Sequence, residues 1–372
     1  MIGSMSKIKK LIKTPHLFLR DFLNRKYPVI NCEQGYSEVD ERATIACQAK
    51  LISLESGLVG KSQHPIDVVF TWVDNKDLAW TQKYQAAIKD VNGVAVGLYA
   101  NDESRFESHN ELYYSVLSVR RYMPWIRKIF IVTDEQQPNF SFDAEEVIVV
   151  DHKEIIDRVY LPTFNSHVIE AFLHRIEGLS ENFIYFNDDV FVARDLLPGH
   201  FFRSNGLASI FIAKKSLVEM AVKGVSTPTL GASLHSKKLL EAQYSITIDN
   251  PLVHTYVPLK KSAYDLAWEL FEPDIRIFLD NKLRGNNDLN MATFLVPWLM
   301  YLEKESVPAQ DICYYFNIRS AHALTLYRKL LQKKKMDSQP HSFCANDFNS
   351  KTPVDFPYSL ALEEMLFNFY KK

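Results

Sequence analysis

Apolar segments with strand character recur along this chain, and segments with helical periodicity separate them. The strand-like segments cover residues 66–73, 127–132, 146–150 and 182–192, and the helical ones include residues 111–122 and 164–176. Strands that alternate with helices form parallel sheets covered on both faces. The sequence therefore predicts an α/β fold with a mainly parallel sheet.

Polar residues lie where three of these segments end. Asp74 and Asp134 follow the first two segments, and residues 187–189, Asn-Asp-Asp, interrupt the last one. Ligands bind beyond the carboxyl ends of parallel strands. On an unbroken strand Asn187 and Asp189 share one face, while Asp188 points to the other.

A carboxylate inside an apolar strand needs a partner, because burying an unpaired charge is costly. Mg²⁺ and Mn²⁺ take oxygen ligands, usually one or two carboxylates with substrate phosphates. Residues 187–189 therefore predict a metal site. The alternative is that the two acids cap neighbouring loops or pair with arginine.

A second group of polar residues lies within residues 161–175. His167, Glu170 and His174 are spaced to share one helical face, and Asn165 or Ser166 can cap that helix. The free N–H groups of the helix start can face a phosphate. This pattern predicts that at least one of the three residues has a catalytic or metal-binding role. The alternative is a polar helix face whose groups have their hydrogen bonds satisfied.

Farther along, His254 is followed by a polar and basic segment at residues 281–288 that contains Lys282, Arg284 and Asp288. Lysine and arginine are the side chains that hold a diphosphate, and arginine can engage two oxygens at once. An ordinary surface loop is the alternative here.

Charge is distributed unevenly along the 372 residues. The net charge is −2, but residues 1–30 hold seven Lys or Arg and one acid, interleaved with apolar residues. A basic amphipathic segment can lie on an anionic membrane surface; the alternative is a solvated arm that packs on its own domain. We expect a basic N-terminal arm and connector over residues 1–64 and a catalytic domain over residues 65–372. A helical insertion is expected over residues 207–250.

Composition excludes several classes of protein. The near-neutral net charge argues against a nucleic-acid binder. The four cysteines are dispersed without a C-x-x-C motif, which argues against a disulfide scaffold and against a cysteine-type zinc site, and fits a cytoplasmic location. The longest apolar run, residues 291–302, is too short to span a bilayer.

Taken together, these motifs resemble the Stealth family of hexose-1-phosphate transferases, which includes bacterial capsule polymerases and the animal lysosomal-enzyme GlcNAc-phosphotransferase. Four family regions occur in order, and two further stretches also match. The family usually has a basic residue at position 113, arginine at 117 and often histidine at 281, where this chain has Tyr113, Leu117 and Asn281. The matching segments are residues 66–74, 104–134, 161–189, 254–258, 281–288 and 343–347.

The resemblance implies a GT-A-like fold and a specific reaction. A UDP-activated hexose, such as an N-acetylhexosamine, donates its hexose-1-phosphate unit to a sugar hydroxyl and UMP leaves, which builds a phosphodiester-linked capsular polysaccharide. It implies Mg²⁺ (or Mn²⁺) held by Glu170, Asp188 and Asp189. The phosphate-binding residues would be Lys282 and Arg284, and the proton acceptor would be His167 or His254. The substrate-binding residues would be Asp74, Arg105, Asp288, Asn346 and Asp347.

Two other functions remain open. One is a conventional metal-dependent GT-A glycosyltransferase that releases UDP, and the other is a non-catalytic envelope scaffold. For the transferase we expect three partners: the nucleotide sugar, the growing polysaccharide and a glycosyltransferase of the capsule machinery. We expect a peripheral position on the cytoplasmic face of the inner membrane and no nucleic acid.

Overall fold

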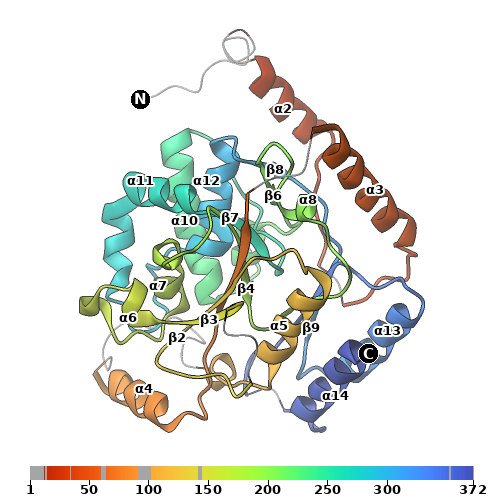
Figure 1. Cartoon of the computed structure of the whole chain (residues 1–372). Helices are drawn as coiled ribbons and strands as arrows, with labels where there is room; N and C mark the ends of the chain where they lie inside the picture. Colours follow the sequence, from red (N-terminus) through yellow and green to blue (C-terminus); the bar gives the residue numbers. More distant parts are fainter. Residues whose placement is uncertain are drawn as a thin grey trace.

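A five-stranded sheet forms the centre of the molecule (Figure 1). The computed structural model describes residues 12, 15–33, 35–59, 64–90, 102–140, 145–351 and 353–371. The strand order is β3-β2-β1-β4-β7. Strands β3, β2, β1 and β4 are parallel, and β7 pairs antiparallel with β4 at one edge. The strands are β1 (Ile66–Thr71), β2 (Ile129–Thr133), β3 (Val147–Asp151), β4 (Asn182–Asn187) and β7 (Val257–Lys260). The predicted α/β fold with a mainly parallel sheet is confirmed.

Two smaller sheets adjoin the central one. In the first, β10 (Ser342–Asn346) pairs antiparallel with β5 (Val190–Val192) and parallel with β9 (Cys313–Asn317). The second pairs β6 (Ala208–Ile210) with β8 (Ser306–Pro308). Strand β5 follows β4 after two residues, so the chain passes directly from the central sheet into the three-stranded sheet.

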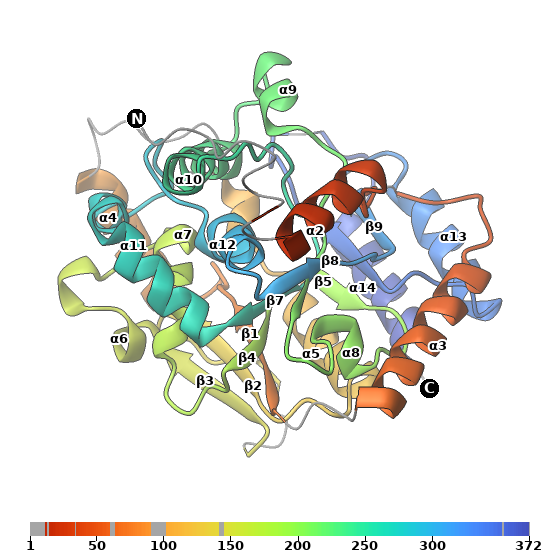
Figure 2. The same cartoon turned by 90° about the horizontal axis from the view of Figure 1, so that it is seen from above.

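Helices lie on both sides of the central sheet (Figures 1 and 2). One side has α7 (Ser166–Glu170), α10 (Pro228–Tyr244), α11 (Lys261–Leu279) and α12 (Val296–Leu302). The other has α5 (Glu111–Tyr122), α13 (Ala323–Lys335) and α14 (Tyr358–Tyr370). The remaining helices are α2 (Pro15–Lys26), α3 (Arg42–Val59), α4 (Leu78–Asp90), α6 (His152–Ile155), α8 (Pro198–Phe201) and α9 (Leu217–Val222). Short 3₁₀ segments are η1 (Glu103–Arg105), η2 (Arg158–Tyr160) and η3 (Leu173–Arg175), and η4 (Met291–Leu295) is a π-helix.

Most predicted elements occur where the sequence indicates them. Helix α5 spans the residues predicted, and α9 and α10 supply the helical content expected over residues 207–250. The apolar run in β1 is explained by burial, because its residues from Ile66 to Phe70 are all buried between helices. Residues 311–335 begin with strand β9 and continue into α13.

The predicted strand over residues 182–192 is wrong in one respect. Strand β4 ends at Asn187, and Asp188 and Asp189 form a turn before β5 begins at Val190. Asn187 and Asp189 therefore do not share a strand face. Two adjacent carboxylates are costly to bury in the middle of an apolar sheet, because no polar groups surround them there. The strand accordingly ends before them, and the two acids lie in the turn. We call Asp188 and Asp189 the acidic turn.

The predicted helix over residues 164–176 is also interrupted. It consists of α7 and the 3₁₀ turn η3, so His174 does not share a face with His167 and Glu170. The ring of His174 stacks on Tyr264, and burial lowers the pKa of His174 to about 4. His174 is thus a core residue outside the site.

The basic arm is described at residue 12 and from α2 onward, so the rest of its first 14 residues lies outside the described part of the chain. Helix α2 begins at Pro15, as expected for a residue with a preset φ. Asn24 Nδ2 donates to Tyr301 Oη at 2.9 Å, which fixes α2 against α12. Among the described residues, no helix has the length and apolar character needed to cross a membrane.

Candidate active site

The candidate site lies beyond the carboxyl ends of β1 and β4, where Thr71 pairs in register with Asn187. Tyr185, near the end of β4, joins these strands to α7. Its hydroxyl lies 2.9 Å from Thr71 Oγ1, 2.9 Å from Asn187 Oδ1 and 3.4 Å from Glu170 Oε1. The other carboxylate oxygen of Glu170, Oε2, is buried and has no hydrogen-bond partner in the described chain.

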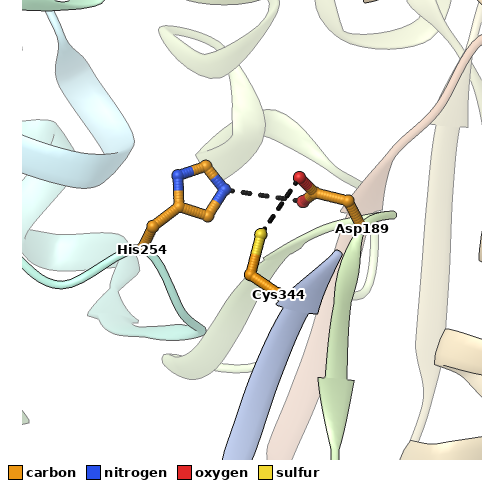
Figure 3. A group of neighbouring side chains, drawn as sticks. All are labelled: Asp189, His254 and Cys344. Carbon is orange, nitrogen blue, oxygen red and sulfur yellow. Dashed lines mark hydrogen bonds and ion pairs between the residues drawn. The ribbon is translucent and has the colours of Figure 1, made fainter. Parts of the chain in front are cut away.

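Asp189 of the acidic turn faces residues from two distant segments (Figure 3). Its Oδ2 accepts hydrogen bonds from Asn346 Nδ2 at 2.9 Å and from Cys344 Sγ at 3.2 Å. His254 Nε2 lies 3.5 Å from Oδ1. That contact is too long for a good hydrogen bond, and Oδ1 is buried with no donor among the described residues. The pairing of β10 with β5 is what places Cys344 and Asn346 beside Asp189.

Asp189 and His254 shift each other's protonation. Burial alone would raise the pKa of Asp189, but the His254 ring and the two donors to Oδ2 outweigh it and hold the pKa below its usual value. Burial alone would lower the pKa of His254, but the Asp189 carboxylate outweighs it and raises the pKa. The pair therefore favours a carboxylate beside an imidazole that readily holds a proton.

Asp188, the other residue of the acidic turn, faces acids. Burial, followed by repulsion from Glu111 and Asp189, raises its pKa well above the usual value. Burial also raises the pKa of Glu111 to about 7. Closely spaced buried carboxyls cannot all ionise without a counter-charge, so this part of the site favours a bound cation or a retained proton.

On the other side of Glu170, a network forms around the fully buried Asp288. Its Oδ2 lies 2.8 Å from His167 Nδ1 and accepts from Asn165 Nδ2 at 2.9 Å and Gly285 N at 3.1 Å. Its Oδ1 accepts from Asn281 Nδ2 at 2.7 Å. A Cβ atom at position 285 would lie only 2.6 Å from Asn281 Nδ2, so glycine is the residue that fits beside the Asn281 side chain without moving it. We call these five residues the Asp288 network.

Two half-buried arginines lie between these groups. Arg284 donates to Ser166 Oγ at 2.5 Å and Thr229 Oγ1 at 3.1 Å, and its Nε is buried without a partner in the described residues. The Arg105 side chain has no hydrogen bond or ion pair with the described part of the protein. Burial lowers the pKa of Arg284. Burial, together with repulsion from nearby Arg284, lowers that of Arg105 well below its usual value.

Three of the predicted site residues have protein partners instead. Lys282 Nζ donates to the Tyr160 carbonyl at 3.0 Å, and Asp74 Oδ1 accepts from the Lys76 amide at 3.0 Å. Asp347 pairs with the Arg319 guanidinium, and its Oδ2 lies 3.0 Å from His109 Nε2.

The carboxylates predicted to bind metal do not converge. Within the described residues, no group of three potential ligand atoms within 4.8 Å contains Glu170 or Asp188, whereas Asp189 forms such a group with His254 and Cys344. Asp189 Oδ1 and Glu170 Oε2 are each buried without a hydrogen-bond partner among the described residues, so both oxygens are free to bind a metal. Metal binding by these residues stays a prediction.

Sequence reasoning did not identify Tyr185, Cys344 or Glu111 as members of the site. Tyr185 belongs to an apolar strand, and its contact with Glu170 depends on where α7 lies. Cys344 appeared in the sequence analysis only as part of the matching segment 343–347, with no role of its own. Glu111 starts a helix, a position at which acids are common.

Comparison with known proteins agrees with these motifs. The family model described as Stealth protein CR2, conserved region 2, matches residues 105–210. The capsular polysaccharide phosphotransferase cps12A of Actinobacillus pleuropneumoniae is 55% identical over 370 residues, which is 98% of each chain. The capsular polysaccharide phosphotransferase LcbA of Neisseria meningitidis is 54% identical over 99% of this chain and 100% of the relative.

A solved structure, the galactosyltransferase LgtC with donor and acceptor sugar analogues, aligns with 82% of this chain and 97% of its own at 9% identity and a TM-score of 0.39. A likeness this weak carries no argument. These two sequence relatives extend over nearly the whole chain, and both are named capsular polysaccharide phosphotransferases. The chain belongs to the Stealth family of bacterial capsular polysaccharide phosphotransferases.

Proposed function

We propose that this transferase moves hexose-1-phosphate from a UDP-sugar to a sugar hydroxyl and releases UMP. The observation that carries the proposal is the pair of arginines, Arg105 and Arg284, that lie near each other and form no ion pair with the described residues. Two neighbouring guanidinium groups repel, and although the nearby Glu170 carboxylate attracts both, a further anion between them would be stabilised. A diphosphate supplies that charge and matches the donor geometry of arginine.

A divalent cation fits the other side of the site. The unpartnered Oδ1 of Asp189 and Oε2 of Glu170 are oxygen ligands of the kind that Mg²⁺ or Mn²⁺ accepts together with phosphate oxygens. When bound there, the cation would neutralise diphosphate charge. Asp188 lies in the same turn and would add negative potential.

The proposed reaction is an in-line displacement at the β-phosphorus. The acceptor hydroxyl oxygen forms a bond to that phosphorus, and the bond to the bridging oxygen of the diphosphate breaks. UMP leaves with the bridging oxygen, and the bond between sugar and phosphate stays intact. Arg105 and Arg284 hold the phosphate oxygens during the displacement, which stabilises the charge that builds up there.

His254 is the better placed of the two histidines to take the hydroxyl proton. Its side chain is 36% exposed, and Asp189 stabilises the imidazolium that forms. The side chain of His167 is only 2% exposed. His167 instead holds the Asp288 network, which carries Arg284 on the same loop.

The test is to measure the nucleotide product. The purified protein, Mg²⁺, a short capsule oligosaccharide and a panel of UDP-hexoses and UDP-N-acetylhexosamines are incubated, and UMP and UDP are separated by chromatography. We expect UMP and a phosphodiester signal in the phosphorus NMR spectrum of the product. Release of UDP with no phosphodiester would establish a conventional glycosyltransferase instead. A donor that reacts only when a second glycosyltransferase is added would identify the partner enzyme.

Variants connect that product to the site. R284A should lose transfer while keeping its thermal unfolding midpoint. R276A is the matched control, because Arg276 is exposed and pairs with Glu272 one helical turn away. Full activity in R284A would contradict the diphosphate site.

We also propose that α2 holds the enzyme on the cytoplasmic face of the inner membrane. Leu19, Phe22 and Leu23 share one helical face and remain 55%, 45% and 45% exposed after Asn24 has packed on α12. An apolar face beside basic residues suits an anionic lipid surface. Cosedimentation with phosphatidylglycerol vesicles should be lost in L19S/F22S/L23S and kept in L78S, which removes another exposed leucine. Equal binding of both variants would exclude α2 as the anchor.

A further inference from the structure

The cluster of Asp189, His254 and Cys344 combines three kinds of ligand atom: a carboxylate oxygen, an imidazole nitrogen and a thiol sulfur. One ligand atom from each residue lies within 4.8 Å of the other two. The shortest contacts are 3.2 Å between Cys344 Sγ and Asp189 Oδ2, and 3.5 Å between His254 Nε2 and Asp189 Oδ1. Figure 3 shows the sulfur and the ring nitrogen both directed at the carboxylate.

Each side chain is held from a different direction. Cys344 is buried on β10, and the Ala345 amide donates to the Asp189 carbonyl at 3.0 Å, which fixes the strand against the acidic turn. The His254 amide donates to Glu33 Oε1 at 2.7 Å. The three ligand atoms therefore meet without a rearrangement of the backbone.

This set of donors does not suit the cation expected for the reaction. Mg²⁺ takes oxygen ligands and disfavours sulfur, whereas Zn²⁺ takes nitrogen, sulfur and oxygen together in a tetrahedron. Bond lengths of about 2.0–2.3 Å separate neighbouring tetrahedral ligands by roughly 3.3–3.7 Å. Each of the two contacts, one to either oxygen of Asp189, lies close to that spacing, and one atom from each of the three residues lies within 4.8 Å of the others before any metal is bound.

We propose that Asp189, His254 and Cys344 form a binding site for Zn²⁺ and that zinc bound there inhibits transfer. Binding releases the thiol proton of Cys344 to solvent, and a water completes the tetrahedron. The inhibition rests on the proposed function, because bound zinc would occupy the nitrogen that takes the acceptor proton and the carboxylate expected to hold Mg²⁺. The binding itself does not rest on it.

Co²⁺ is a suitable probe, because it takes the same ligands as Zn²⁺ and a thiolate bound to it gives an intense near-ultraviolet charge-transfer band. The full-length protein is titrated with Co²⁺ in the absence of nucleotide. We expect the band in the wild type and in C47S, and we expect C344S to lack it. Cys47 is the control because it is a free cysteine exposed on α3, outside the cluster. Absence of the band from the wild type, or its persistence in C344S, would overturn the site.

Inhibition is tested separately with the nucleotide-release assay in saturating Mg²⁺. Added Zn²⁺ should abolish UMP release, EDTA followed by fresh Mg²⁺ should restore it, and C344S, compared with its own rate in the absence of zinc, should need at least about tenfold more zinc for half inhibition. Zinc binding without inhibition would refute the second half of the proposal alone. If no UDP-sugar reacts at all, the proposed function fails, and the Co²⁺ band still decides the metal site.

Discussion

His167 Nδ1 lies 2.8 Å from Asp288 Oδ2, and the two side chains are only 2% and 0% exposed. A carboxylate has no proton to donate, so the ring must donate Nδ1–H to it, which leaves Nε2 as the unprotonated nitrogen. Burial, and then nearby Arg284, lowers the pKa of His167. The contact is thus a neutral histidine bonded to a buried carboxylate. It connects α7 to the loop that carries Arg284.

The first prediction concerns the stability that this contact supplies. D288N should lower the free energy of unfolding by about 1–3 kcal/mol. In the wild type both carboxylate oxygens of Asp288 accept hydrogen bonds, from four donors in all. The asparagine side chain replaces one of these oxygens with an NH₂ group, which is itself a donor and cannot accept. Urea unfolding followed by circular dichroism measures the loss. D265N is the control, since Asp265 is 72% exposed and should change stability by less than about 0.5 kcal/mol. An unchanged D288N would mean that the network does not support the fold.

A second prediction uses the pair of Asp189 and His254. Since the Asp189 carboxylate is what raises the pKa of His254 against the effect of burial, D189N should move that pKa below the wild-type value. Histidine NMR titration reports it, with the signal assigned by its absence from H254Q. D195N should leave the titration unchanged, because Asp195 is exposed and belongs to no ligand group around Asp189. D189N should also reduce transfer by at least about 100-fold.

A third prediction tests Arg105 as a binding group for the donor. R105Q should raise KM for the UDP-sugar by roughly 10- to 100-fold, the loss expected for one or two charge-assisted hydrogen bonds. Initial-rate kinetics against donor concentration measure it, and R276Q should match the wild type. An unchanged KM would place the diphosphate elsewhere.

The fourth prediction concerns pH. Because burial raises the pKa of Glu111 from its usual 4.5 to about 7, the folded protein retains a proton that the unfolded chain releases. The stability associated with protonated Glu111 is present below pH 4.5 and is lost as the pH rises toward 7. E111Q cannot ionise, so its stability relative to the wild type should increase by about 3 kcal/mol between pH 4.5 and 7.

Thermal unfolding at several pH values measures the effect of E111Q. E103Q is the matched control, because Glu103 is exposed at a nearby position and should follow the wild type at every pH. A constant difference between E111Q and the wild type would show that Glu111 ionises normally in the fold.

The sequence predicted the parts of the fold that depend on local pattern. The apolar run at Ile66 and the helix that starts at Glu111 were recognisable because burial on both faces and helical periodicity each leave a regular spacing. The polar residues 187–189 were recognised from the sequence as unusual within an apolar strand. Their geometry was predicted wrongly, because the alternation of side chains between the two faces of a strand holds only while the strand continues, and β4 ends at Asn187.

What the sequence could not supply was pairing between distant segments. Cys344 meets Asp189 only because β10 pairs with β5, and no local pattern encodes that register. Likewise, Lys282 and Arg284 look equivalent in the sequence. Their environments differ because one side chain reaches the Tyr160 carbonyl and the other reaches α7. The choice between them depends on tertiary packing.

The contact between Asn346 and Asp189 joins positions 157 residues apart. During translation, Asp189 is therefore made long before the strand that holds its carboxylate. At about 5–20 residues per second, the growing polypeptide spends roughly 8 to 30 seconds without that support. The nascent enzyme should therefore stay inactive on the ribosome until β10 has emerged and paired, so substrates meet only finished molecules.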